Sequence, residues 1–417
     1  MRVLRSLEEL DEALAECDRA ERISDDAMRV VFGTFRIDPP AGMPEDPFSD
    51  AYREAQMGIY ATIAGRGYAL ENEATPLDVD AALRRPFPYS TGSGTTAGEH
   101  LMGIGFALRA MALPPGSRVL EFGPGWGNTT LELARLGHHV TCVDVEPRFC
   151  ELIRRRAERE GLSIEVVHDD FFWAERSGAT FDAVLFFECF HHCADHLRLL
   201  RALQARVAEG GRLFFGGEPI TADFPQPWGV RLDGNSLWAI RKNGWLELGF
   251  HEDYFQRALA RAGWSGRRIP CADPSWATVW EARRLTRTAL HLPATDERVH
   301  TAVGRRENGA IVLDGRAGTG LFGPYLPLAR GGWTARLRFR PGAPAMGGAV
   351  MDISTGNGAS RIAARAVQGE ALIAEGWTAS LPFTAAEDLI GVEVRLFCEA
   401  GFAAVLDGVE LVPEEGG

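Results

Sequence analysis

The stretch "VLEFGPGWGNTT", residues 119–130, connects a short apolar strand to the first residues of a helix. Gly123, Gly125 and Gly127 alternate through the connection, where glycine permits a tight turn and brings backbone N–H groups close to a ligand. Asp144 follows in the next apolar segment, where a carboxylate can accept hydrogen bonds from ribose hydroxyls. The stretch therefore predicts the ligand-binding corner of a parallel sheet.

Strand and helix patterns alternate on both sides of this corner. The pattern predicts strands at 118–122, 139–145, 163–168, 181–187 and 212–217, and helices at 128–137, 147–161 and 196–211. An insertion at about 218–250 interrupts the alternation, before a helix at 252–263 and strands at 266–271 and 277–284. This spacing predicts a Rossmann-like, doubly wound α/β sheet.

The two ends of the chain follow other patterns. Residues 1–90 read as mostly helical: Ser6 and Glu9 form a capping-box pattern, and another helix is expected after Ser49. Beyond about residue 295 apolar residues alternate with polar ones, as in "WTARLRFR" at 333–340, which predicts an antiparallel β-sandwich. We expect a helical region at 1–90, the α/β domain at 91–292 and an all-β domain at 293–417.

Composition narrows the classes of protein. The 417 residues are 46% hydrophobic with a net charge of −13, which argues against binding nucleic acid or an anionic membrane by bulk charge. The sequence has no apolar run long enough to span a bilayer, and its start lacks the apolar core of a secretory signal. Seven scattered cysteines do not resemble a disulfide framework, so we expect a cytoplasmic protein.

The glycine loop distinguishes two cofactor classes. A dinucleotide fingerprint requires glycine at position 128, where this chain has Asn128. The pattern E-x-G-x-G-x-G instead resembles the first motif of the class I S-adenosylmethionine-dependent methyltransferases, and the resemblance covers roughly residues 115–285. It implies that Glu121 and the loop glycines Gly123, Gly125 and Gly127 bind the cofactor, and that Asp144 holds its ribose.

Two further stretches match this family in order. "VVHDDFF" resembles the third motif, which implies that Asp170 bonds the adenine amino group and that the backbone of Phe171 meets the ring. Asp169 stands where the family has glycine, so the choice between Asp169 and Asp170 stays open. "FDAVLFFECFHHCAD" resembles the fourth motif, which places Glu188 beside the cofactor's methyl group and near the acceptor.

The loop "ECFHHCADH", residues 188–196, follows the fourth predicted strand. Cys189 and Cys193 have no second cysteine pair nearby, so the spacing argues against structural zinc. His191 and His192 are candidates for the general base that deprotonates an acceptor hydroxyl, and we favour His192. Alternatively, both histidines hydrogen-bond the backbone at a helix start, and His196 is expected on the exposed side of that helix.

A metal-assisted variant of the chemistry is a weaker alternative. Some sugar O-methyltransferases hold a divalent cation that lowers the pKa of the acceptor. Carboxylates that offer oxygen ligands near this loop are Glu188, Asp195, Glu252 and Asp253. Their spacing specifies no site, so we predict that no metal is bound.

The acceptor is predicted from the insertion and from the turn-rich stretch at 86–96. Aromatic rings beside bidentate polar groups suit sugar recognition, and a packed cap over the sheet is the alternative. The insertion holds three tryptophans, Trp228, Trp238 and Trp245. The predicted substrate-binding residues are Tyr89, Trp228, Arg231, Asp233, Trp238, Arg241 and His251. The β-domain resembles, by strand pattern, the jelly-roll modules of carbohydrate-active enzymes.

The leading hypothesis is an S-adenosylmethionine-dependent O-methyltransferase that acts on a sugar or glycan in polysaccharide or glycosylated natural-product assembly. One alternative is a methyltransferase whose acceptor is a lipid or another small hydroxylated or amine compound. The other is a non-catalytic module that binds the cofactor and acts through its β-domain. We expect no nucleic-acid partner and no membrane span, and the chain is a candidate homo-oligomer.

Overall fold

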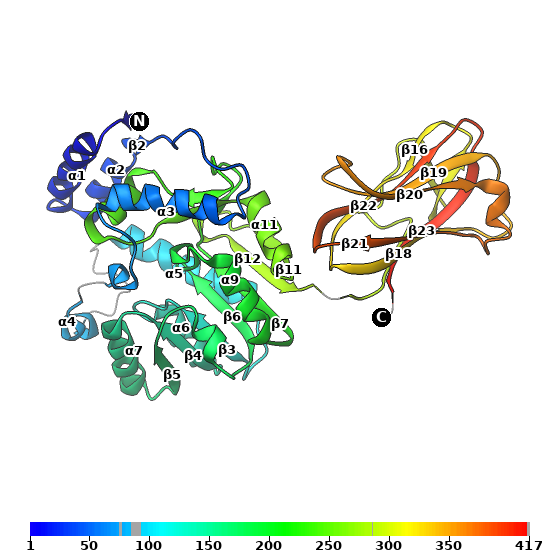
Figure 1. Cartoon of the computed structure of the whole chain (residues 1–417). Helices are drawn as coiled ribbons and strands as arrows, with labels where there is room; N and C mark the ends of the chain where they lie inside the picture. Colours follow the sequence, from blue (N-terminus) through cyan, green and yellow to red (C-terminus); the bar gives the residue numbers. More distant parts are fainter. Residues whose placement is uncertain (75–76, 85–92, 286, 415–417) are drawn as a thin grey trace. The chain divides into compact units, whose positions relative to one another are not determined.

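A computed structural model describes residues 1–74, 77–84, 93–285 and 287–414 (Figure 1). The chain divides into two compact units. The first comprises Met1–Ala262 and Gly266–Arg283, and the second comprises Gly263–Ser265 and Arg284–Gly417. None of the helices in the described residues combines the length and the apolar character needed to cross a membrane.

The first unit begins with three capped helices, of which those after Ser6 and Ser49 were predicted. Helices α1 (Leu7–Glu21), α2 (Asp25–Phe32) and α3 (Asp50–Ala64) each start after a serine whose side chain accepts a backbone N–H of the first turn. Ser6 accepts from the Glu9 N–H, so this half of the capping box is formed. The chain continues through a 3₁₀ turn, η1 (Leu70–Glu73), and helices α4 (Val79–Arg84) and α5 (Gly94–Met111).

A seven-stranded sheet in the order β11-β12-β7-β6-β3-β4-β5 forms the centre of this unit. Its strands are β3 (Arg118–Phe122), β4 (His139–Asp144), β5 (Ile164–His168), β6 (Phe181–Phe187), β7 (Val207–Gly216), β11 (Trp264–Ile269) and β12 (Val279–Arg284). Strands β3 to β7 pair in parallel, and β12 pairs antiparallel with β7. The predicted doubly wound fold is confirmed.

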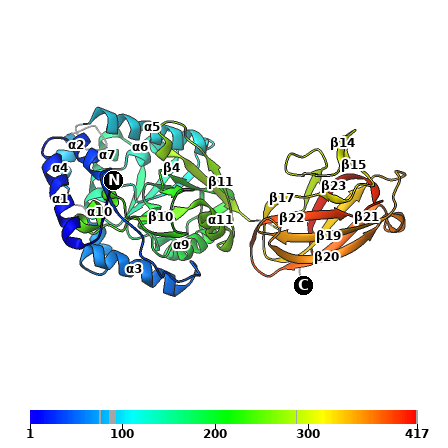
Figure 2. The ribbon, with the colours of Figure 1, turned by 90° about the horizontal axis from the view of Figure 1, so that it is seen from above.

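Helices cover both faces of the sheet (Figure 2). Helix α5 and α6 (Asn128–Arg135) pack on one face, where Ile104 and Leu133 share a buried cluster with Leu185. Helix α11 (Glu252–Arg261) packs on the other face, where the Phe255 ring lies 5.2 Å from that of Phe215. Helix α7 (Pro147–Glu160) connects β4 to β5 and ends at Gly161, as predicted.

One predicted helix is too long. The structure ends α9 (His196–Ala202) early, adds a 3₁₀ turn, η3 (Leu203–Ala205), and starts β7 at Val207. Val207 pairs with Phe181 of β6, and Gly210 adopts φ +71°, which a helix does not allow. Pairing with a buried strand therefore outweighs the helical preference of residues 207–209.

The insertion builds a small second layer. Strands β8 (Ile220–Thr221), β10 (Leu248–His251) and β9 (Trp228–Val230) form a three-stranded sheet in that order. Between β9 and β10 lie α10 (Gly234–Trp238) and one π-helical turn, η4 (Ala239–Asn243). As a result, residues 245–247 of the insertion lie near the end of β6, where the histidine loop begins.

The second unit consists of two antiparallel sheets. One has the order β14-β15-β23-β18-β21 with β13 also on β23, and the other has the order β16-β22-β19-β20 with β17 also on β22. The strand bounds are β13 (Leu290–Pro293), β14 (Arg305–Glu307), β15 (Ala310–Asp314), β16 (Gly318–Leu321), β17 (Pro324–Leu328), β18 (Gly331–Phe339), β19 (Gly348–Thr355), β20 (Ser360–Gln368), β21 (Thr378–Ala385), β22 (Leu389–Cys398) and β23 (Ala403–Pro413).

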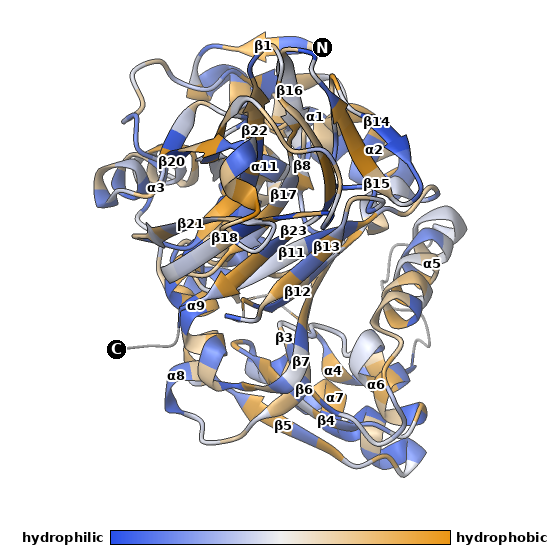
Figure 3. Cartoon of the chain, turned by 90° about the vertical axis from the view of Figure 1, so that its right-hand side faces the viewer, coloured by the Kyte–Doolittle hydropathy of each residue, from blue (hydrophilic) through white to orange (hydrophobic). Residues whose placement is uncertain are grey.

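Both sheets contribute to one core, as the sequence alternation predicted. Trp333 and Leu337 of β18 share a buried cluster with Val392 and Val394 of β22. Hydrophobic and hydrophilic residues alternate along these strands (Figure 3). This sandwich confirms the expected all-β region.

Candidate active site

The glycine loop leaves room beside its backbone at one position. Gly123, Gly125 and Gly127 all have positive φ, between +51° and +74°. A side chain at Gly123 would meet Cys189 at 2.7 Å and one at Gly127 would meet Ile153 at 2.5 Å, whereas one at Gly125 would meet nothing within 4 Å. Gly123 and Gly127 are thus needed for packing, and Gly125 borders open space.

That space is a cavity of about 370 Å³ at the carboxyl ends of the parallel strands. Of the predicted cofactor residues, Glu121, Gly123, Gly125, Asp144, Asp170, Phe171 and Glu188 line it. Gly127 does not appear among the described lining residues, since it packs against Ile153. The carboxyl ends of β3, β4 and β6 meet at this edge, where ligands of open α/β sheets bind.

Two buried carboxylates lie in the wall. Asp144 accepts the N–H groups of Gly125 at 3.0 Å and Glu146 at 2.8 Å, and burial raises its pKa to about 6. Glu121 accepts the Thr130 hydroxyl at 2.5 Å, and burial raises its pKa to about 7. An open backbone turn beside a buried carboxylate fits a ribose-bearing cofactor.

Asp169 and Asp170 both line the cavity, so the structure does not choose between them. Arg176 donates to both carboxylates, at 2.6 and 2.8 Å, and Asp170 also accepts the Phe172 N–H. The Phe171 ring supplies an apolar wall and lies 5.8 Å from the ring of Phe122.

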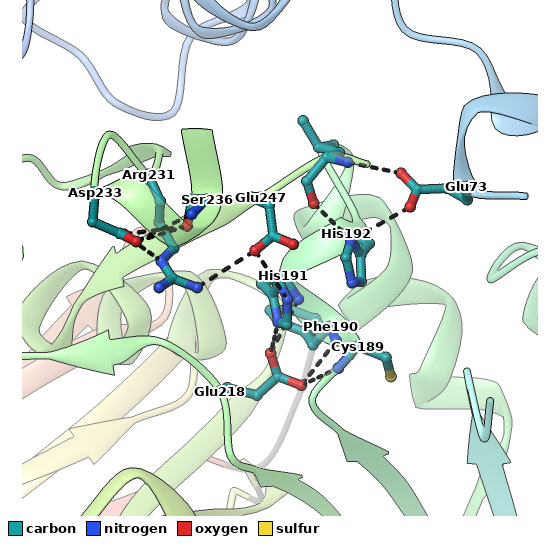
Figure 4. A network of polar contacts seen from close by, with 11 residues as sticks. Glu73, Cys189, Phe190, His191, His192, Glu218, Arg231, Asp233, Ser236 and Glu247 are labelled. Atoms are coloured by element: carbon teal, nitrogen blue, oxygen red, sulfur yellow. Dashed lines mark hydrogen bonds and ion pairs between the residues drawn. The ribbon is translucent and has the colours of Figure 1, made fainter. Parts of the chain in front are cut away.

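A single carboxylate holds the histidine loop. Glu218, just after β7, accepts the backbone N–H groups of Cys189, Phe190 and His191 at 2.9, 2.8 and 3.1 Å (Figure 4). These three residues enter the 3₁₀ turn η2 (Phe190–His192). Because parallel pairing places the ends of β6 and β7 side by side, Glu218 reaches the start of the turn.

His191 points away from the cavity into a buried charged network. Its Nδ1 donates to Glu218 at 2.8 Å, and its Nε2 lies 3.7 Å from a Glu247 carboxylate oxygen. Burial by itself lowers the pKa of His191, but the charges of Glu218 and Glu247 outweigh it and raise the pKa. Arg231 lies 3.4 Å from Glu247 and continues the network (Figure 4).

His192 lines the cavity. Its Nδ1 lies 2.7 Å from the Leu246 carbonyl, and because a carbonyl oxygen only accepts, Nδ1 carries the proton. Burial, followed by the charge of His191, lowers the pKa of His192 well below its usual value. The ring is therefore neutral, with its unshared pair on Nε2, to which no described residue donates a hydrogen bond.

The sequence comparison agrees with this geometry. Residues 119–211 match the profile of a family described as "Methyltransferase domain". This part of the chain is similar in sequence to methyltransferase domains. Methyltransferase domains of this kind use S-adenosylmethionine, and most of the residues expected to bind that cofactor line the cavity.

Curated relatives of the methyltransferase domain include two proteins named "Ubiquinone biosynthesis O-methyltransferase". The one from Methylocella silvestris is 41% identical over 24% of this chain and 39% of its own length. The one from Xanthomonas axonopodis pv. citri is 34% identical over 40% of this chain and 62% of its own length. The chain thus spans about two fifths of the length of the first of these relatives and about three fifths of the length of the second.

Solved structures also resemble the methyltransferase domain. The Burkholderia thailandensis 1,6-didemethyltoxoflavin-N1-methyltransferase, solved with S-adenosylhomocysteine, is 22% identical. The match covers 50% of this chain and 92% of that one, with a TM-score of 0.35.

The methyltransferase cavity also contains residues that no motif predicted. Tyr68, Leu70 and Glu73 come from the N-terminal region, His100 from α5 and Trp245 from the insertion. The Trp245 indole N–H is buried without a hydrogen-bond partner in the described part of the chain. Trp245 belongs to the Trp-rich insertion from which the acceptor was predicted. Only the folded chain brings the other four residues to the cavity, so the sequence held no signal for them beyond residue type.

Two of the insertion's three tryptophans, Trp228 and Trp238, lie elsewhere, although both were proposed for sugar binding. Trp228 is 2% exposed, donates to the Pro47 carbonyl, and lies 4.8 Å from the ring of His196. Trp238 packs on Phe32. Neither is among the described residues that line the cavity.

The polar residues of that proposal also contact the protein. Asp233 caps α10 and accepts from Arg231, and His251 caps α11. Arg241 donates to Asp11. The described cavity lining includes none of these four residues, and Tyr89 lies outside the described residues.

The expectation that His196 is exposed is wrong. His196 is 2% exposed, and its Nε2 lies 2.7 Å from the Tyr254 hydroxyl. The insertion and α11 cover this face of α9, which the sequence pattern of α9 alone could not show.

His191, His192 and Glu247 place potential metal-ligand atoms within 4.8 Å of one another. Arg231 already supplies positive charge beside Glu247, at 3.4 Å. The arrangement fits a network of charged hydrogen bonds, and the absence of a metal remains a prediction.

The four carboxylates considered for a metal have separate partners. Glu188 lies 3.2 Å from Nδ1 of His100, and Asp195 pairs with Arg53 at 2.6 Å. Glu252 pairs with Arg268 at 3.0 Å, and Asp253 lies 3.9 Å from His251.

Proposed function

We propose that the chain is an S-adenosylmethionine-dependent O-methyltransferase in which His192 is the general base. When bound, the cofactor supplies an electrophilic methyl group. The observation that carries the proposal is the placement of His192 in the cavity wall with Nδ1 held by the Leu246 carbonyl. This tautomer leaves Nε2 to take the proton of an acceptor hydroxyl as the oxygen attacks.

His191 has a supporting role in this proposal. Its ring is held by Glu218 and is 7% exposed, so it does not offer a nitrogen to the acceptor. The ring centroids of the two imidazoles lie 4.2 Å apart, so the charge of His191 helps keep His192 neutral.

A sugar or glycan hydroxyl is our first candidate acceptor. Support comes from the unpaired Trp245 N–H in the cavity wall and, by fold analogy, from the β-sandwich. Trp228 and Trp238 pack against other parts of the protein, so these two rings do not support a sugar acceptor. A phenolic hydroxyl is the second candidate, because the relatives' name refers to ubiquinone biosynthesis.

The setting of the protein is also a proposal. The seven cysteines are buried free thiols, which supports a reducing, cytoplasmic environment. Assembly of the chain into a homo-oligomer stays a prediction.

The test measures release of S-adenosylhomocysteine by mass spectrometry with a panel of sugars, glycans and phenols. His192→Ala should lower turnover roughly 10²–10⁴-fold without changing cofactor affinity in calorimetry. His139→Ala, an exposed histidine at the opposite end of β4, is the matched control. A His192→Ala enzyme within a few-fold of wild type contradicts the base, and cofactor binding without transfer to any acceptor favours the non-catalytic module.

A further inference from the structure

The N-terminal region contributes a wall of the cavity. Tyr68, Leu70 and Glu73 line it, although they lie well before the matched methyltransferase domain. Asn72 anchors their 3₁₀ turn, because its side-chain amide donates to the Tyr60 hydroxyl of α3 at 3.0 Å and to the Gly67 carbonyl at 3.1 Å. The first of these hydrogen bonds holds the turn against helix α3.

Glu73 contacts the same residue, Leu246, whose carbonyl orients His192. One carboxylate oxygen accepts the Leu246 N–H at 3.0 Å, while the Leu246 carbonyl accepts from Nδ1 of His192 at 2.7 Å. The other oxygen of Glu73 lies 3.5 Å from the same Nδ1 (Figure 4). One acidic side chain therefore binds the residue that holds the imidazole and also stands beside the imidazole.

We propose that Glu73 is a positioning residue for His192, fixing the imidazole through Leu246 and stabilising the positive charge that forms on the ring during methyl transfer. The inference rests on the proposed function, since it needs His192 as the base. The acceptor O–H bond breaks as the proton moves to Nε2, and the oxygen gains the methyl group as the methyl–sulfur bond breaks, which would leave S-adenosylhomocysteine. Nδ1–H stays hydrogen-bonded to the Leu246 carbonyl. His192 returns the proton to solvent after the product leaves.

The surroundings of His192 explain why such a partner is needed. Burial and the charge of His191 both oppose protonation of His192, so a nearby anion must compensate if the ring is to accept a proton. Glu73 is itself buried, and burial raises its pKa to about 8. Its carboxylate therefore forms fully only above about pH 8.

Several groups face this pair and contribute to its titration. Those around Glu73 are Tyr60, Tyr68, His191 and Glu247, and those around His192 are His191, Glu73 and Arg231. Burial has the largest effect on the pKa of Glu73 and raises it. Of the two neighbouring charges, Glu247 raises this pKa and His191 lowers it.

The experiment is the pH dependence of single-turnover methyl transfer. For the wild-type protein, we expect the rate to rise with pH and to level off above about pH 8. Glu73→Gln keeps a similar shape but has no charge, so it should lower the plateau by about tenfold or more and remove the rise. Glu71→Gln, an exposed neighbour in the same turn, is the matched control and should behave as wild type.

Two further variants keep the outcome decisive. Glu73→Asp retains a carboxylate and should retain the rise with pH, which serves as the test if Glu73→Gln fails to fold. Suppose that His192→Ala is inactive. If Glu73→Gln then keeps the wild-type rise and plateau, or if Glu73→Asp loses the rise, only the inference about Glu73 fails. If His192→Ala remains active, the proposed base fails, and the role of Glu73 fails with it.

Discussion

The carboxylate of Glu218 binds His191 twice, through the backbone N–H at 3.1 Å and through ring Nδ1 at 2.8 Å. The same side chain accepts the N–H groups of Cys189 and Phe190. It is therefore the main polar support of the loop that carries His192 into the cavity.

Replacement of Glu218 should affect both stability and turnover. Glu218→Ala leaves three buried N–H groups and a buried imidazole without their acceptor, and each unsatisfied group costs about 1–3 kcal/mol. We expect the free energy of unfolding in urea to fall by about 3–5 kcal/mol, with loss of methyl transfer. Glu209→Ala, an exposed glutamate of β7, should change neither, and an equal effect of the two variants would contradict this role.

Substitutions in the glycine loop should separate packing from cofactor binding. Gly127→Ala drives a methyl group to within 2.5 Å of Ile153, so it should lower the melting temperature markedly. Gly125→Ala meets no protein atom within 4 Å, so beyond roughly 1 kcal/mol of backbone strain it should weaken S-adenosylmethionine binding instead. Calorimetry and thermal unfolding check this contrast, which fails if Gly125→Ala binds the cofactor normally.

Glu121 should make the cofactor-free protein less stable as the pH rises. Burial raises the pKa of Glu121 from its ordinary 4.5 to about 7 in the folded state. The folded protein then binds more protons than the unfolded chain between these values, so this stability is present below about pH 4.5 and is lost as the pH rises through about 7. Asp144, with a pKa raised to about 6, acts in the same direction.

Glu121→Gln removes this contribution. Between pH 5 and pH 7.5 the wild-type free energy of unfolding should fall by about 2–3 kcal/mol more than that of the variant. Urea unfolding at the two pH values measures the difference. Parallel changes in the two proteins would show that Glu121 does not titrate in this range.

Removal of divalent metal should leave methyl transfer unchanged. Arg231 and His191 already place positive charge beside the Glu247 carboxylate, so this carboxylate attracts a metal cation only weakly. The measurement compares turnover before and after dialysis against a chelator, with Mg²⁺, Mn²⁺ or Zn²⁺ added back. Loss of activity that a metal restores would show that His191, His192 and Glu247 act as ligands.

Much of the fold could be predicted because its signals are local. The strand β3, the glycines after it and the cap of α7 at Gly161 each depend on a few neighbouring residues, and their predicted bounds agree with the structure to within a residue or two. The end of α9 could not be predicted, since it depends on Val207 pairing with Phe181, which is distant in the sequence.

The candidate site divides in the same way. Glu121, Gly125 and Asp144 lie on consecutive elements with fixed spacing, so their shared cavity followed from sequence. The different roles of His191 and His192 did not, because adjacent residues share one sequence context and differ only in the groups they face. Glu218, Leu246 and Glu73 provide those groups, from three segments with no common motif.

By itself, the sequence determined that this chain has a Rossmann-like parallel sheet with a glycine turn, an acid at the end of the next strand and a histidine loop. These features depend on backbone conformation and on periodicity, which act over a few residues. Tertiary structure alone decided which histidine reaches the cavity and that Trp228 and His196 are buried. Those outcomes depend on burial and on hydrogen bonds between distant segments, which form only when the chain has folded.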